Sequence, residues 1–219
     1  MDKLISCKNL YWRSDTADPP EILSDIALEL GKNEMIVIRG SGGSGKSSLL
    51  RILAGEERHS SGKLLYSGEE YTGKSGVRTR SSVLDLGYIS EESPFISSED
   101  MQKNIDFVLK LRGVPDSSRF DRNMEILQKT GLIDKRKMPV KMLSMTEKKL
   151  FSLAVMLARG CGIYLCDLNL TGFSDEENMI NLLKDETHRG AGVIVTARSD
   201  AEIKGARVKN IDIKDGKII

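Results

Sequence analysis

The sequence has few of the features that would place a protein within a membrane or on a nucleic acid. No window approaches the roughly 18 apolar residues of a membrane-spanning helix, and the first residues do not form an apolar leader. In the 219-residue chain, 33 Lys and Arg face 32 Asp and Glu, so no net charge attracts nucleic acid. We therefore expect a cytoplasmic protein that does not bind nucleic acid.

Cysteines are also scarce. The three present, Cys7, Cys161 and Cys166, are an odd number, and two of them lie in apolar runs. This usage indicates small core residues in a reducing compartment rather than a disulfide or metal framework. A chain of this length without internal repeats suits one domain with a substantial core.

The clearest chemical signal is the sequence GSGGSGKS at residues 40–47, which fits the phosphate-binding pattern G-x-x-x-x-G-K-[ST]. A short β-branched run at 35–39 predicts a strand before it, and helical spacing of apolar residues at 47–54 predicts a helix after it. This context favours a phosphate loop over a flexible Gly/Ser linker, because backbone N–H groups and a helix N-terminus would surround an anion. Lys46 would reach the β- and γ-phosphates, and Ser47 would hold Mg²⁺. The predicted nucleotide-binding residues are Gly40, Ser41, Gly42, Gly43, Ser44, Gly45, Lys46, Ser47 and Ser48.

Strand and helix patterns alternate along the rest of the chain. Strands are expected over 4–12, 21–30, 63–66, 83–90, 163–166, 193–196, 208–213 and 217–219, with an exposed loop over 69–82. Helices are expected over 146–159 and 174–187, with a short helix before residue 208. Two amphipathic segments, 100–111 and 120–130, occupy the region 91–141 without a strand pattern. The order predicts one α/β domain, 1–219, with a mainly parallel sheet in a core of 1–90 and 142–219 and a helical subdomain over about 91–141.

These motifs resemble, from end to end, the nucleotide-binding subunit of an ATP-binding cassette (ABC) transporter. The resemblance is closest to stand-alone subunits of the cell-division and lipoprotein-release types. After the phosphate loop, four weaker motifs follow in the family's order: GYISE at the Q-loop (87–91), LSMTE at the signature (143–147), IYLCD at Walker B (163–167) and VTA at the switch (195–197). The resemblance implies a P-loop NTPase fold of ABC type, with an N-terminal antiparallel β portion and an inserted helical subdomain.

The resemblance also implies ligands and partners. ATP would be bound with Mg²⁺, which Ser47, Glu91 and Asp167 would hold. Each ATP would lie between the phosphate loop of one subunit and the signature of another, in a homodimer or a heterodimer of ABC subunits. The helical subdomain would dock on a permease-like membrane subunit, at the inner face of the cell membrane. Trp12 is the candidate for stacking on adenine, and simple core packing is its alternative role.

The departures from the family's pattern concern hydrolysis. The family's Walker B strand ends in Asp-Glu, whereas Asp167 is followed by Leu168, which can neither accept a proton nor orient water. Losing a general base costs about 100- to 10,000-fold in rate. Ala197 replaces the switch histidine, Ser174 replaces the aspartate of the next loop, and the signature has lost two glycines and gained the charge of Glu147. The sequence therefore assigns no catalytic residue and predicts Mg-ATP binding with weak or absent hydrolysis.

Several assignments stay open. The protein is either such a weak ATPase, an active ATPase with Glu91 or Glu176 as a relocated base, or a structural or regulatory module that has lost nucleotide. Acidic residues at a helix start, such as Glu176, also suit the helix dipole without any catalytic role. Basic residues gather near the signature, at 135–137, 141 and 148–149. The favoured interpretation is that they form a solvated face rather than an interaction patch. Phe95 and Ile96 are either core residues or part of the docking loop.

Overall fold

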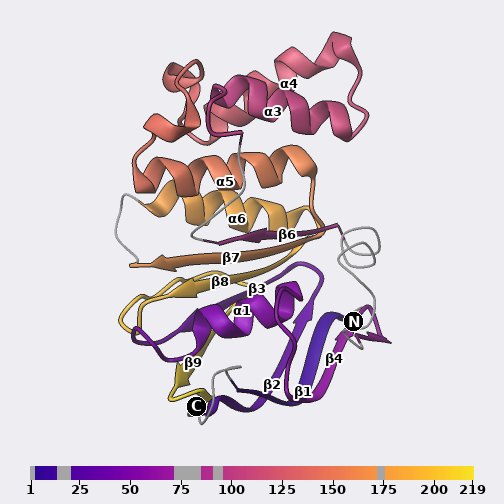
Figure 1. The fold of residues 1–219 in the computed structure, drawn as a ribbon, viewed down its shortest axis with the longest axis vertical. Coiled ribbons are helices and arrows are strands. Elements are labelled where there is room, and N and C mark those ends of the chain that lie inside the picture. The colour runs from indigo at the N-terminus through magenta and orange to yellow at the C-terminus, as the bar shows by residue number, and fades with distance from the viewer. Residues whose placement is uncertain (1–2, 14–20, 72–84, 91–95, 172–175) are drawn as a thin grey trace.

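The structure is a computed structural model that describes residues 3–13, 21–71, 85–90, 96–171 and 176–219 (Figure 1). Its strands form two sheets, with the orders β2-β1-β4-β5 and β10-β9-β3-β8-β7-β6. The first sheet is antiparallel and contains β1 (Lys3–Arg13), β2 (Glu21–Gly31), β4 (Ser61–Tyr66) and β5 (Glu69–Glu70). The second contains β3 (Glu34–Arg39), β6 (Leu86–Ile89), β7 (Ile163–Leu170), β8 (Gly192–Ala197), β9 (Val208–Lys214) and β10 (Lys217–Ile218). In this sheet β6, β7, β8, β3 and β9 run parallel, and β10 pairs antiparallel with β9.

The helices lie in layers around the parallel sheet (Figure 1). Helix α1 (Lys46–Ala54) lies between the two sheets, whereas α5 (Met145–Arg159) and α6 (Glu177–His188) cover the opposite face of the parallel sheet. Helices α3 (Met101–Leu111) and α4 (Asp116–Lys129) form an outer layer beyond α5, and the short 3₁₀ turns η1 (Ile133–Lys135) and η2 (Val140–Met142) lead from α4 to α5. None of the helices in the described ranges combines the length and the apolar composition needed to cross a membrane.

Alternation along β3 explains why the sheet is covered on both faces. Met35 and Val37 are buried in the core under α5 and α6, whereas Ile36 and Ile38 are buried in the core around α1. Successive strand residues point to opposite faces, so an uninterrupted apolar run fits a sheet that is buried on both sides. Cys7, Cys161 and Cys166 are also buried, and burial raises the thiol pKa of Cys7 and of Cys161 to about 11. The prediction that the cysteines are small core residues is confirmed.

The predicted ABC-type α/β fold is confirmed, with three local corrections. The segment 198–207 forms no helix: the Asn210 side chain donates a hydrogen bond of 3.1 Å to the Ile203 carbonyl, which a helix would instead pair with a backbone N–H four residues on. Residues 69–70 form a short strand that pairs with the end of β4 rather than the start of a loop, and 72–82 lie outside the described residues. Strand β7 continues to Leu170, four residues beyond its predicted end at Cys166, with consequences for the site.

Candidate nucleotide-binding site

The phosphate loop connects β3 to α1 as predicted. Two of its glycines occupy positions that only glycine fits. A Cβ atom at Gly40 would lie 2.5 Å from the Ile213 carbonyl oxygen and 2.5 Å from Ser44 Oγ, so no larger residue fits. Gly45, at the start of α1, has a φ angle of 103°, which is accessible to glycine but strained for other residues. The chain thus turns sharply beneath β3 and enters the helix with its backbone N–H groups facing the loop.

Lys46 lies inside this loop. Its Nζ donates hydrogen bonds of 2.7 Å to the Gly40 carbonyl and 2.8 Å to the Ser41 carbonyl, and only 7% of the residue is exposed. Burial lowers the pKa of Lys46, and the nearby carboxylate of Asp167 partly opposes this effect. The loop therefore holds a cation at its centre, as a site for a polyphosphate requires.

A pocket of about 290 Å³ opens beside Lys46. It is lined by Gly42, Gly43, Ser44, Gly45, Lys46, Ser47, Ser48, Asp167 and Asn169. The backbone N–H groups of the first residues of α1 have no acceptor within the helix, and Ser44 Oγ is buried without a hydrogen-bond partner among the described residues. Free donors around a buried cation fit the phosphate chain of a nucleotide.

The structure also brings together two of the three predicted Mg²⁺ ligands. Ser47, on α1, and Asp167, on β7, both line the pocket and offer the hard oxygen atoms that Mg²⁺ prefers. Thr196 Oγ1, on β8, donates a hydrogen bond of 2.8 Å to Asp167 Oδ1 and fixes the orientation of that carboxylate. Glu91 lies outside the described residues, so its assignment stays a prediction. Ser47 and Asp167 would hold the ion, which would neutralise charge on the phosphates when bound.

The residue after Asp167 does not face the pocket. Leu168 is 0% exposed and packs in the core under α5 and α6, whereas Asn169, which is exposed, lines the pocket beside Asp167. The sequence comparison with the family treated position 168 as the missing catalytic position and overlooked Asn169. The signal that could have found Asn169 is its residue type, because asparagine tolerates the left-handed backbone that a strand bulge uses.

Other predicted residues lie apart from the pocket. Trp12 is partly buried against the core around α1 and is not among the residues that line the pocket, so its role on adenine stays a prediction. Ala197, at the switch position, is fully buried. Glu176 accepts a hydrogen bond of 2.6 Å from the backbone N–H of Thr171, the residue after β7.

The signature segment starts α5 and carries a capping box. Ser144 Oγ accepts a bond from the Glu147 backbone N–H, and the Glu147 carboxylate accepts one of 2.8 Å from the Ser144 N–H. The other carboxylate oxygen of Glu147 pairs with Lys135. The carboxylate of Glu147 is therefore already bonded within this chain rather than free to face a partner's nucleotide. The Ser-x-x-Glu spacing could have revealed the capping box.

This arrangement predicts a pH dependence. Pairing with Lys135 and the bond from Ser144 hold the pKa of Glu147 at about 2, below the value of about 4.3 expected in the unfolded chain. The stabilising contribution is present above about pH 4.5 and is lost as the pH falls toward 2. We expect Glu147→Gln to lower the free energy of unfolding by about 1 kcal/mol at pH 7, by about the same amount down to about pH 5, and by progressively less at about pH 4 and pH 3. Urea unfolding of both proteins checks this, with Lys63→Gln, at an exposed ion pair, as the control. An equal difference at every pH would contradict it.

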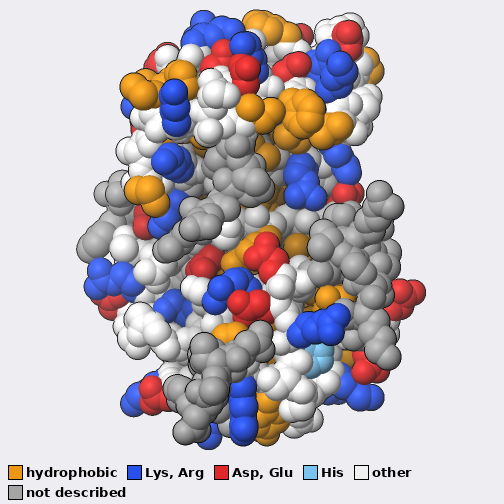
Figure 2. Space-filling model, in the orientation of Figure 1, with side chains coloured by type: hydrophobic (Ala, Val, Ile, Leu, Met, Phe, Trp, Pro, Cys, Tyr) orange, Lys and Arg blue, Asp and Glu red, His pale blue; other side chains and the backbone are white. Residues whose placement is uncertain are grey.

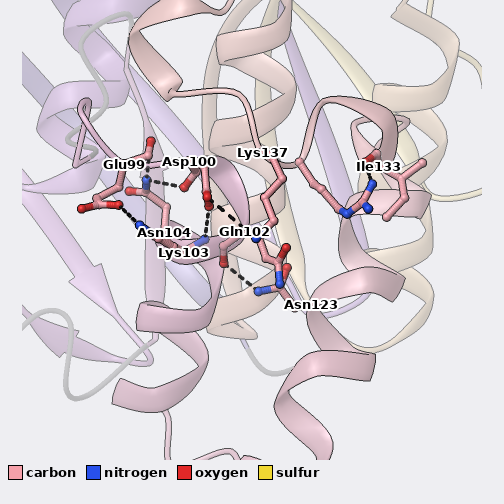
Figure 3. Close-up of polar contacts among 9 residues, drawn as sticks. Glu99, Asp100, Gln102, Lys103, Asn104, Asn123, Ile133 and Lys137 are labelled. Atoms are coloured by element: carbon pink, nitrogen blue, oxygen red, sulfur yellow. Dashed lines mark hydrogen bonds and ion pairs between the residues drawn. The ribbon is translucent and has the colours of Figure 1, made fainter.

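Polar contacts in the helical layer tie the segment before α3 to the rest of this layer, and Figure 3 shows those of Asn104 with Glu99 and Asp100. The buried Asn104 side chain donates to the carbonyls of Ile96, at 3.1 Å, and Asp100, at 3.0 Å, and accepts from the Ile96 N–H. The Val140 N–H donates to the Glu99 carbonyl and the Lys141 N–H to the Ser97 carbonyl. The segment 96–100 is thus bonded to the chain that leads directly into the signature. Phe95 lies outside the described residues, and Ile96 is 45% exposed.

Comparison with known proteins identifies the family. The family model described as ABC transporter matches residues 23–168, about two thirds of the chain. The chain therefore belongs to the ABC transporter family and has the fold and phosphate loop of its ATP-binding domains.

The similar curated proteins are ATP-binding components of import and export systems. The chain is 29% identical over 200 residues to the methionine import ATP-binding protein MetN of Rhizobium johnstonii, which covers 90% of the chain and 55% of that protein. It is 31% identical over 202 residues to the macrolide export ATP-binding/permease protein MacB of Campylobacter fetus subsp. fetus, which covers 91% of the chain and 31% of that protein. The chain thus spans between about a third and three fifths of the length of the curated relatives it matches.

Solved structures share the fold. The ABC subunit cbiO1 of Clostridium perfringens, part of the transporter complex cbiONQ, matches with a TM-score of 0.80 at 20% identity, over 100% of this chain and 88% of that one. The ATP-binding cassette MJ0796, in a dimeric post-hydrolysis state bound to ADP and Pi, matches with a TM-score of 0.81 at 20% identity, over 98% of this chain and 96% of that one.

Proposed function

We propose that the protein is the ATP-binding subunit of an ABC-type membrane complex, that it binds Mg-ATP, and that it hydrolyses ATP weakly or not at all. The observation that carries the proposal is the composition of the phosphate pocket. Lys46, Ser47 and Asp167, which suit binding, line it together, whereas the only carboxylate among the described residues that line it is that of Asp167. A carboxylate that holds Mg²⁺ is not free to accept a proton from water.

The proposed weak hydrolysis also rests on where the two candidate relocated bases, Glu176 and Glu91, lie. Glu176 accepts a backbone hydrogen bond from Thr171 and is not among the residues that line the pocket, so its carboxylate is held at the end of β7. Glu91 lies outside the described residues and stays the other candidate of the active-ATPase alternative. A general base must come within about 3 Å of the attacking water, directly or through one water molecule. Whether a carboxylate lies close enough to the water, and not whether acidic residues are present nearby, therefore decides between a weak and an active ATPase.

Steady-state turnover by the purified protein tests the proposal. We expect phosphate release at least about 100-fold below that of an ABC ATPase with an intact base, measured in parallel under the same conditions. Ordinary transporter rates that Lys46→Ala abolishes would contradict weak hydrolysis. The second alternative, a module that has lost nucleotide, predicts no shift in the melting temperature with Mg-ATP. Binding to a competent site, with Mg-ATP at 100 times its Kd, would instead raise the free energy of unfolding by about 2.7 kcal/mol.

Docking on a permease-like membrane subunit is the second part of the proposal. The relatives named above are components of import and export systems, one of them an ATP-binding/permease protein. Hydrophobic side chains gather on the helical layer at the top of the view in Figure 2. The exposed large apolar residues in this part of the chain are Ile96 before α3, Phe107 and Leu111 on α3, Phe120 on α4, Met142 in η2 and Met145 at the start of α5. A protein bound in this way would lie on the inner face of the cell membrane, paired with itself or with a second ABC subunit.

Substitution in the docking loop tests this part. We expect Ile96→Asp to abolish co-purification with a membrane partner, because a charge would replace an apolar contact, and Lys46→Ala to leave it largely intact. Ile219→Asp, which changes a residue that is 76% exposed at the C-terminal end, away from the helical layer (Figure 1), is the matched surface control. Circular dichroism verifies folding of each variant. Binding that is lost with Lys46→Ala and kept with Ile96→Asp would mean that the nucleotide governs assembly.

A further inference from the structure

Strand β7 carries a bulge immediately after Asp167. Cys166 pairs with Val195 and Leu170 pairs with Ala197, so four steps along β7 match two steps along β8. Asn169 lies within the bulge and has a left-handed φ angle of 47°. A bulge re-aims the side chains of its strand, and asparagine is among the few residues that adopt this backbone readily.

Three hydrogen bonds from three different parts of the chain hold this bulge. Thr196 Oγ1 accepts from the Asn169 backbone N–H at 2.9 Å. Lys149 Nζ, on α5, donates to the Leu168 carbonyl at 2.7 Å, and the Arg198 N–H donates to the Leu170 carbonyl at 2.7 Å. The conformation that puts Leu168 in the core and Asn169 at the pocket is therefore specified by β8, by α5 and by the segment after β8.

Asn169 carries a carboxamide rather than a carboxylate at the pocket. It lines the same pocket as Lys46 and Ser47, which suit the terminal phosphates, and as Asp167, which suits Mg²⁺. A carboxamide offers two N–H donors and carries no charge, so it can donate a hydrogen bond to an anionic phosphate oxygen. It cannot act as the base that takes a proton from water.

We propose that Asn169 donates a hydrogen bond to the γ-phosphate of bound ATP and makes the pocket prefer ATP to ADP. The inference rests on the proposed function, because it requires that the pocket binds Mg-nucleotide. It adds to that function a residue that favours binding of ATP over ADP.

Separate affinities for ATP and ADP, each measured with Mg²⁺ by calorimetry, test this inference. We expect Asn169→Gly, which keeps the left-handed backbone unstrained, to weaken ATP binding about tenfold and ADP binding less than twofold. Asn169→Asp should weaken ATP binding further, because its charge would repel the γ-phosphate. Asn33→Gly is the matched control, since Asn33 also has a positive φ of 58° and lies outside the phosphate pocket.

The outcomes separate the inference from the proposed function. Equal losses of ATP and ADP affinity in Asn169→Gly would show that the residue only supports the bulge, and unchanged affinities would show that it does not contact the nucleotide. Either result overturns this inference alone. A wild-type protein that binds neither nucleotide would overturn the proposed function and the inference with it.

Discussion

Replacing Leu168 with glutamate is expected to lower the free energy of unfolding by about 3 to 5 kcal/mol, without creating an active ATPase. In the ABC family the catalytic glutamate follows the Walker B aspartate, so this substitution is the obvious attempt at repair. Leu168 is 0% exposed and packs in the core under α5 and α6, however. A glutamate there would bury a charge without a partner and would not present it to the pocket. Urea unfolding and phosphate release, measured on the same preparation, check both parts.

Leu168→Met is the control for this experiment. It changes the shape of the side chain at nearly constant volume and is expected to cost less than about 1.5 kcal/mol. A Leu168→Glu protein that is as stable as the wild type and hydrolyses ATP at transporter rates would contradict the structure of the bulge.

Removing the amine of Lys46 is expected to weaken Mg-ATP binding by about 30-fold to 1,000-fold. Lys46 is the one cation among the described residues that line the phosphate pocket, and burial makes its interaction with an anion stronger than it would be in water. Thermal shift in a titration with Mg-ATP measures the effect in Lys46→Ala. The unliganded variant must be measured too, because Lys46 also donates to the carbonyls of Gly40 and Ser41.

Lys63→Ala is the control for Lys46→Ala, since the Lys63 side chain is 67% exposed on β4. It is expected to leave nucleotide affinity unchanged. Equal affinities of the wild type and Lys46→Ala for Mg-ATP would show that the phosphate loop is not the nucleotide site.

The sequence predicts best what local signals determine. The phosphate loop, with its strand and its helix, follows from glycines, apolar periodicity and the Lys-Ser pair over about twenty residues, and the structure confirms all three elements. The alternating strands and helices likewise predict the ABC-type sheet, and family motifs in the right order support it. Each of these signals lies within a single segment of the chain.

The sequence predicts poorly the features that depend on contacts between segments far apart in the chain. The bulge at Asn169 depends on Thr196 from β8 and on Lys149 from α5, and neither contact follows from the residues next to Asp167. For the same reason, the family pattern places Leu168 at the position of the glutamate but cannot show that its side chain is buried in the core. The sequence also predicts a short helix before residue 208, but the described chain there forms none, and the Asn210 side chain on β9 bonds to the Ile203 carbonyl instead.

The identity of the nucleotide that stays bound to the protein tests the central claim most directly. Purified protein is mixed with less than one equivalent of Mg-ATP, quenched with acid at intervals, and analysed for ATP and ADP by chromatography. The account predicts saturable binding in which most of the nucleotide is still ATP after many minutes, in the wild type as in a parallel sample of Leu168→Met. Conversion of the bound ATP to ADP within seconds would contradict it.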